Sequence, residues 1–147
     1  VTVELVGNHE IDTDIIPNSI FDHLGIKKHQ GCGKIMLDFS KISFYLSEKQ
    51  KTGTTSFDVL SKELEGKKVM NECVLTYLFI NPHLIPEDWK KDSEGNARHI
   101  FFWGTIFHDN GSLYVPYLYF DGFRWNALSR WYQDIFDIND PAVVFEV

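Results

Sequence analysis

Three aspartates near the C-terminus, Asp134, Asp137 and Asp140, recur at every third position, and His108 precedes them in the chain. Carboxylates and a histidine can act together as general acid and general base once a fold brings them close. Aspartates spaced in this way also cap turns and helix ends. A small hydrolase that uses Asp134 or Asp137 with His108 therefore stays open as one alternative. The nucleophile elbow, P-loop, HExxH and GxGxxG motifs are absent from the sequence.

Two short segments combine residue types that ligate metals. His23, His29 and Cys32 form an H-x5-H-x2-C pattern, which lacks a fourth ligand and matches no common zinc site. Residues 9–14 carry one histidine and three acidic side chains, but they do not form an EF-hand loop. We therefore predict no metal and no cofactor. Cys32 and Cys73 are too far apart for a CxxC motif, and we expect two buried thiols, with disulfide pairing left open.

Aromatic side chains are dense between residues 101 and 136, which suggests a binding surface. Alternation along residues 123–132, read as a strand, places one set of side chains on each face. The first set is Phe123, Trp125, Ala127 and Trp131. The second, which we expect to face solvent, is Arg124, Asn126, Leu128, Arg130 and Tyr132. Tyrosine, tryptophan and arginine supply rigid contact area with polar tips. The predicted binding residues are Arg124, Trp125, Asn126, Arg130, Trp131 and Tyr132.

The leading hypothesis is a non-enzymatic binding or interaction module that uses this aromatic and arginine-rich sheet face. Its partner would be a protein, a glycan or a second copy of the chain, and a carbohydrate-binding domain is the nearest alternative. Packing of the same aromatic residues in a core is the competing interpretation. A formal net charge of -7 argues against binding to nucleic acid, because that affinity depends on lysine and arginine neutralising phosphates.

The compartment stays open from the sequence, with the cytoplasm favoured. No run of about 18 apolar residues predicts a membrane span. The first residue is Val1 rather than methionine, which leaves open the removal of a signal peptide or tag.

The 147 residues suit a single α+β domain, with a helical half over about residues 1–96 and an antiparallel sheet over about residues 97–147. We expect the helices to cover one face of this sheet. The elements expected in the first half are a strand over 1–6, a helix from Ser19 to Leu24, a helix from about Ser40, a polar loop over 49–55, a helix with a Thr55/Asp58 capping box that ends at Gly66, a helix from Asn71 to Asn81-Pro82, and an exposed connector over 83–95. Ile35, Leu37 and Phe39 suit a short strand equally well.

The last third carries the clearest pattern in the chain. Apolar, strand-like runs over 100–107, 113–120 and 123–132 are joined by Asp109-Asn110-Gly111 and Asp121-Gly122. Asn-Gly and Asp-Gly between apolar runs are typical of tight hairpins. These turns predict an antiparallel meander, with a last strand over 142–147.

Four segments in the C-terminal half carry a resemblance: His-Leu-Ile-Pro-Glu-Asp-Trp at 83–89, Phe-Phe-Trp-Gly-Thr at 101–105, Val-Pro-Tyr-Leu-Tyr at 115–119 and Asn-Asp-Pro-Ala-Val-Val at 139–144. This half resembles small uncharacterised bacterial proteins, a resemblance that implies no particular activity. The aromatic, Asn- and Asp-rich tail is also similar to the variable ends of C-type-lectin-like proteins diversified by retroelements. That resemblance implies a rigid scaffold whose exposed positions bind different ligands. It would make Trp125, Asn126, Arg130, Tyr132 and Asp134 the ligand-facing residues.

Overall fold

The computed structural model describes residues 9–15 and 20–146, in which short strands and short helices are joined by turns and loops. The strands are β1 (Glu10–Asp12), β2 (Gly25–His29), β3 (Lys34–Met36), β4 (Ile42–Tyr45), β5 (Ile100–Phe101), β6 (Thr105–Asp109), β7 (Ser112–Phe120), β8 (Trp125–Trp131) and β9 (Ala142–Phe145). The α-helices are α1 (Glu48–Thr52), α2 (Phe57–Glu63) and α3 (Glu72–Ile80). The 3-10 helices are η1 (Phe39–Lys41), η2 (Pro82–Leu84) and η3 (Glu87–Trp89).

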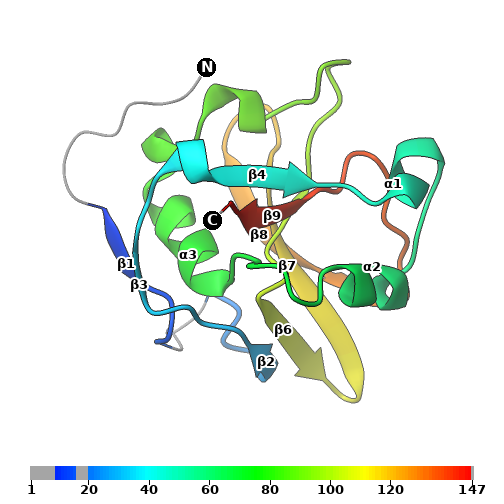
Figure 1. Cartoon of the computed structure of the whole chain (residues 1–147), viewed down its shortest axis with the longest axis horizontal. Helices are drawn as coiled ribbons and strands as arrows, with labels where there is room; N and C mark the ends of the chain where they lie inside the picture. The colour runs from blue at the N-terminus through cyan, green and yellow to red at the C-terminus, as the bar shows by residue number, and fades with distance from the viewer. Residues whose placement is uncertain (1–8, 16–19, 147) are drawn as a thin grey trace.

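Strand β7 organises the main sheet (Figure 1). One edge of β7 pairs with β6 and with β5, the other edge pairs with β8, and all three pairings are antiparallel. Strand β5 contacts β9 in parallel, β9 pairs with β4, and β2 lies outside β6. Strands β1 and β3 form a separate two-stranded sheet. The predicted α+β class with an antiparallel sheet is confirmed, and β2 and β4 from the first half of the chain join that sheet.

The main sheet is covered on both faces. Ile100 and Phe102 point into one core, whereas Phe101 and Trp103 point into the other, as alternation along an extended chain requires. Apolar side chains of α3 pack in the first core and those of α2 in the second. Figure 1 accordingly draws α3 and α2 on opposite sides of the central strands. The expectation that helices cover one face is therefore not confirmed, because the aromatic strands are apolar on both sides.

The glycine turns form where the sequence predicts them. Asn110 and Gly111 take positive φ angles of 49° and 82° between β6 and β7. Between β7 and β8, Gly122 has a φ of 102°, and the carboxylate of Asp121 accepts the main-chain N–H groups of Phe123 and Arg124. The antiparallel meander over β6, β7 and β8 is therefore confirmed.

Two of the expected helices form, with adjusted ends. Asn71 caps α3 by accepting the N–H of Cys73, and the helix stops at Ile80, before Asn81-Pro82. Helix α2 is capped by Ser56 rather than by Thr55, because the main chain of Thr55 pairs with Phe136.

Other expectations for the first half are wrong. The predicted polar loop over 49–55 contains α1, where Ser47 and Gln50 form a capping box. The predicted helix from Ser40 is a single 3-10 turn followed by β4, because Ile42–Tyr45 pairs with β9. The predicted helix that ends at Leu24 is a turn in its described part, and the predicted strand over 1–6 lies outside the described residues.

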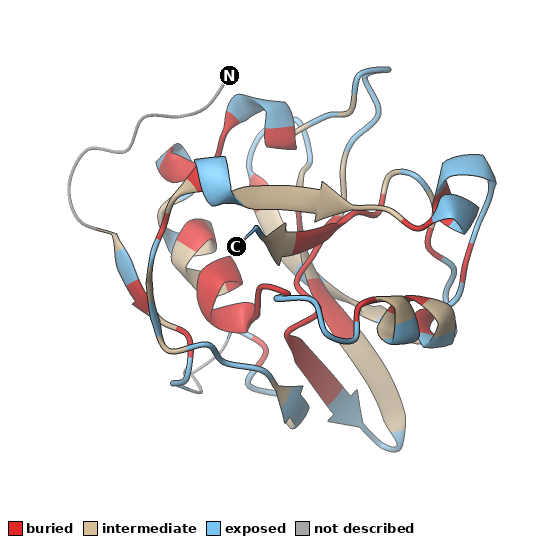
Figure 2. Cartoon of the chain, viewed as in Figure 1, coloured by how far each residue is buried: buried red, intermediate tan, exposed pale blue. Residues whose placement is uncertain are grey.

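The connector over 83–95 is not uniformly exposed. Leu84, Ile85 and Trp89 are buried and extend the core on the α3 side. Figure 2 shows how buried residues gather on α3, on β6 and around the centre of the sheet.

Candidate binding surface

The alternation of side chains along β8 is as the sequence predicts, but burial differs from the expectation. Trp125 is only 7% exposed and packs against Phe120 with ring centroids 5.6 Å apart. Its ring therefore belongs to the core on the α3 side. Trp131, on the same face at the other end of the strand, is 41% exposed.

The other predicted binding residues differ in their surroundings. Arg124 is exposed at the hairpin turn, and the side-chain amide of Asn126 donates to the Asp121 carboxylate at 2.9 Å. Tyr132 is half-buried and packs edge-on against Phe57, with its hydroxyl accepting from Gln133 at 3.0 Å. Hydrogen bonds and packing thus restrict the side chains of Asn126 and Tyr132, whereas the Arg124 side chain is exposed and its charge acts on the Asp121 carboxylate.

Arg130 lies on the face of β8 that alternation predicts, but its side chain packs against the protein instead of extending into solvent. Its guanidinium lies 4.8 Å from the ring centroid of Phe101, 5.4 Å from that of Tyr117 and 5.3 Å from that of Phe136. It also donates to the main-chain oxygen of Ile135 at 3.2 Å and pairs with Asp140 at 2.8 Å. The expectation of a solvent-facing side chain is wrong for Arg130, because these rings and a buried carboxylate hold it, whereas Arg124 and Leu128 of the same face are exposed.

Asp140 is the buried centre of this arrangement, with 4% of its surface exposed. One carboxylate oxygen lies 2.9 Å from His99 Nδ1, and the other lies 2.8 Å from Arg130 and accepts the N–H of Asp137 at 2.8 Å. Burial by itself raises the pKa of Asp140, but the hydrogen bonds from His99 and Arg130 outweigh it and hold the pKa below its usual value. Because a carboxylate can only accept, His99 Nδ1 carries the proton in this pair. We call Asp140, His99 and Arg130 the Asp140 clamp.

The clamp is tied to distant parts of the chain. The buried side-chain amide of Gln50, in α1, donates to the main-chain oxygens of Asp137 and Asp140 at 2.9 Å each. His99, immediately before β5, donates its own N–H to Asn139 at 2.7 Å. The loop that carries Asp140 is therefore fixed from two sides, which leaves the clamp little freedom to rearrange.

Two tyrosines from β7 lie over the imidazole of the clamp. The His99 ring contacts Tyr117 and Tyr119 edge-on, with centroids 5.6 Å away in both cases. Burial, above all other causes, raises the pKa of Tyr117. Opposite these tyrosines on β8 stand Leu128 and Asn126, on the same face of the sheet. We call Tyr117, Tyr119, His99, Asn126 and Leu128 the β7–β8 platform.

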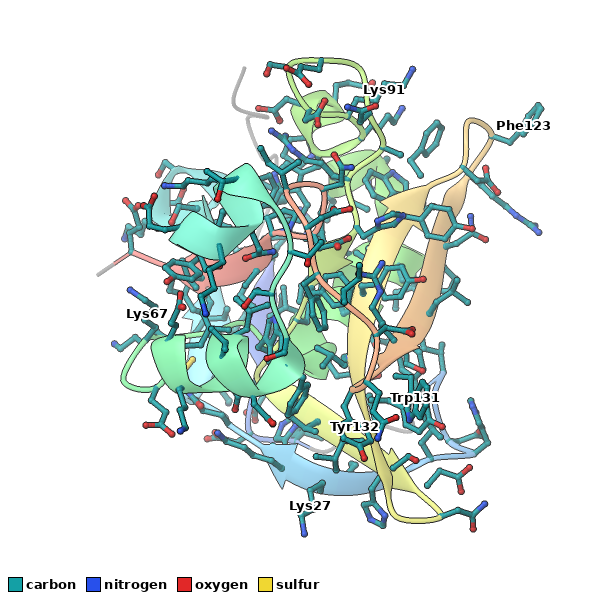
Figure 3. All side chains as sticks on the ribbon, turned by 90° about the vertical axis from the view of Figure 1, so that its right-hand side faces the viewer. Lys27, Lys67, Lys91, Phe123, Trp131 and Tyr132 are labelled. Carbon is teal, nitrogen blue, oxygen red and sulfur yellow. The ribbon has the colours of Figure 1, made fainter. Side chains whose placement is uncertain are left out.

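Several exposed apolar side chains lie on β8 or next to it in the chain. Phe123, at the tip of the hairpin, is 93% exposed, and Leu128 is 45% exposed. Figure 3 shows Phe123 projecting into solvent at one end of β8, with Trp131 and Tyr132 near the other end. Ile135 and Ile138, in the following loop, are also exposed. Most of the large exposed hydrophobic residues of the described chain therefore lie between positions 123 and 138.

The residues of the hydrolase alternative are not linked to one another. Asp137 accepts the N–H of Asn139 at 2.8 Å and so acts as a turn cap, and Asp134 is exposed. His108 is exposed in β6, opposite Gly25 and Leu113. Within residues 9–15 and 20–146, no hydrogen bond joins His108 to either aspartate.

A second polar cluster brings together Cys73, His29 and Asn71. His29 Nε2 lies 2.9 Å from the carbonyl oxygen of Thr13, which can only accept, so Nε2 donates and cannot serve as a base for the Cys73 thiol 3.7 Å away. Burial raises the pKa of Cys73 to about 12. The cluster therefore holds the chain around Thr13 against α3, and burial with a raised pKa disfavours the reactive thiolate form of Cys73.

The two cysteines differ in environment. Both are free thiols, and Cys32 is exposed whereas Cys73 is buried. The expectation of two buried thiols is thus wrong for Cys32, which follows the exposed Gly31 in the loop before β3. Across the part of the chain described here, no three side chains of His, Cys, Asp or Glu lie close enough together to hold a metal ion.

The sequence identifies part of this surface. Arg130, Asn126 and Leu128 follow from strand alternation, and Asp140 is visible as a member of an aspartate series. His99 carries no signal of its own, because its partner Asp140 is 41 residues away and reaches it only through the contact between β5 and β9. Comparison of the chain with family models, with curated proteins and with solved structures finds no match. None of the described helices is long and apolar enough to cross a membrane.

Proposed function

We propose that the chain is a non-enzymatic binding module that recognises a protein ligand through the β7–β8 platform. The observation that carries the proposal is the exposed Leu128 side chain opposite Tyr117, on a sheet face whose His99 and Arg130 are held by hydrogen bonds to Asp140. Exposed apolar groups gathered in one region and rimmed by polar residues are typical of interaction sites. Tyrosine and histidine add contact area and hydrogen bonds at low entropic cost.

The Asp140 clamp supports recognition more than catalysis. A histidine oriented by an aspartate can act as a base, but it then needs a nucleophile or a bound water in reach. Tyr117 and Tyr119 cover His99 edge-on, and Asp140 is also engaged by Arg130. These contacts suit a histidine that holds Tyr117 and Tyr119 in position for binding a ligand.

Selection from a displayed library of random peptides tests the proposal. Peptides selected on the wild-type protein are expected to bind a Tyr119→Ala variant at least about tenfold more weakly. Ile80→Ala is the matched control, because Ile80 is exposed on α3 and lies outside the platform. No selected peptides, or equal binding by both variants, would contradict the proposal.

A carbohydrate ligand is the second candidate. The rings of Tyr117 and Tyr119 are 6.1 Å apart and inclined by 34°, an arrangement that could stack against a sugar. Saturable binding on a glycan array that Tyr119→Ala removes would favour this ligand. An array without binding would exclude it, and hydrolysis of a bound glycan by the wild-type protein would instead favour the hydrolase alternative.

A further inference from the structure

Strand β8 forms an edge of the main sheet and presents its main chain outward. Tyr132 donates its N–H to Leu113 of β7, and Arg124 accepts from Asp121, so even-numbered residues of this segment use their main chain toward β7. The N–H and C=O groups of Ala127 and Ser129 must then point away from β7. No described residue supplies a main-chain partner to those outward groups.

This edge lacks the features that usually keep an edge strand from pairing. Natural edge strands are protected by lysines, prolines, bulges, very short length, inward-pointing charges or a covering helix or loop. Strand β8 has seven residues in regular register with β7 and contains neither lysine nor proline. Its single charged residue, Arg130, turns inward, where the buried carboxylate of Asp140 neutralises it, so it leaves no unpaired charge against an incoming strand. The outward edge is therefore open to another strand.

The sequence of β8 is compatible with pairing to itself. A two-fold axis through Leu128, the middle residue, places Ala127 opposite Ser129 of the copy and Trp125 opposite Trp131. All of these residues are odd-numbered, so the outward N–H and C=O groups of Ala127 and Ser129 meet those of the copy, whereas the C=O of Trp131 already accepts the N–H of Asp134. Arg130 falls opposite Asn126, and no two like charges face one another.

We propose that β8 binds a second copy of this chain, antiparallel and edge to edge, in a dimer centred on Leu128. The two main sheets become continuous across the axis, and the two β7–β8 platforms lie on one shared face with Leu128 between them. Each copy uses its only β8 edge, so the contact is isologous and stops at two chains. The proposal does not depend on the platform having a ligand.

A single cysteine at the axis tests the register. At the centre of such a pair, Leu128 faces itself in a position without hydrogen bonds, where Cα atoms are about 4.5 Å apart and a disulfide fits. Leu128→Cys, made with Cys32→Ser to remove the exposed native thiol, is expected to form a disulfide-linked dimer under mild oxidation. Asn126→Cys in the same background is the matched control, because its copy lies about four residues away along the strand, roughly 13 Å.

The outcomes are distinct. Linkage through Leu128→Cys with little through Asn126→Cys supports the register. Equal linkage of both variants, or none, overturns it. Because the native Leu128 is exposed, the substitution leaves the core intact.

A second variant tests the edge without a new thiol. Ser129 lies opposite Pro116 and does not use its N–H toward β7, so Ser129→Pro removes only the outward donor. Sedimentation of the wild-type protein at up to about 1 mM, the weak end of specific affinities, is expected to reveal a dimer. Ser129→Pro should shift the chain to monomer, whereas Ser129→Ala should not.

A wild-type monomer at that concentration, or a dimer equally stable in Ser129→Pro, overturns the proposal. Thermal melting tests whether the proline variant is folded. If it is unfolded, Ser129→Lys replaces it, because a lysine on an edge strand disfavours pairing without altering the main chain. Tyr119→Ala leaves this edge unchanged. Loss of peptide binding in that variant therefore reports on the platform and not on the dimer.

Discussion

Replacing Asp140 with asparagine tests whether the Asp140 clamp holds the C-terminal loop. The substitution keeps the size of the side chain and removes its charge, which leaves the Arg130 guanidinium among Phe101, Tyr117 and Phe136 without a counter-ion. Removing one partner of a buried ion pair costs about 3–5 kcal/mol. An amide oxygen can still accept the N–H of Asp137, so we expect the lower end, a loss of about 3 kcal/mol in the free energy of unfolding.

Urea unfolding at pH 7, followed by tryptophan fluorescence, measures this loss. The matched comparison is a double-mutant cycle with Arg130→Met, because a neutral side chain beside the asparagine removes the unpaired charge. We expect the double variant to lose about 2 kcal/mol less than the sum of the single variants. A loss below about 1 kcal/mol for Asp140→Asn, with additive variants, would refute the clamp.

The same carboxyl group makes stability depend on pH. Its pKa is lower in the folded protein than in the unfolded chain, so the unfolded chain binds more protons as the pH falls. The stabilisation by Asp140 is therefore complete above the unfolded pKa of about 3.9 and is lost as the pH falls below it toward the folded pKa. Urea unfolding between about pH 5 and pH 2.5 should show a smaller loss of stability for Asp140→Asn than for the wild-type protein. Equal losses would contradict this assignment.

The remaining predictions concern burial and turns. Trp125→Ala should lower the free energy of unfolding by about 3–5 kcal/mol, whereas Trp131→Ala should lower it by less than about 1 kcal/mol. Equal losses in urea unfolding would show that the two rings are equally buried, against this prediction. A thiol reagent at pH 7 should modify Cys32 rapidly and Cys73 only on unfolding, because Cys73 is buried and its pKa is raised to about 12; rapid reaction of two thiols in the folded protein would contradict this. Gly111→Ala should cost about 1 kcal/mol, since its φ of 82° disfavours a side chain although no atom lies in the way, and an unchanged urea midpoint would argue against the turn.

Short-range signals in the sequence determined the hairpins and the longest helix. Asn110-Gly111 supplies the positive φ angles that a tight turn needs, and the alternating apolar runs on either side have no other regular way to bury their side chains. Asn71 caps α3 and the proline after Asn81 ends it, both within one helical turn of the residues they affect. Such features follow from local backbone chemistry, so they are readable without the rest of the fold.

Contacts between distant segments decided the remainder. The apolar spacing around Ile42 suits a helix or a strand, and only pairing with β9, about a hundred residues away, makes it a strand. Alternation assigned Arg130 to a face of the sheet, but alternation cannot say whether that face is wet. The rings of Phe101 and Phe136 and the carboxylate of Asp140 bury it. The burial of a residue depends on which surfaces pack against it. Those surfaces belong to segments distant in the sequence, so the residues around Arg130 cannot reveal them.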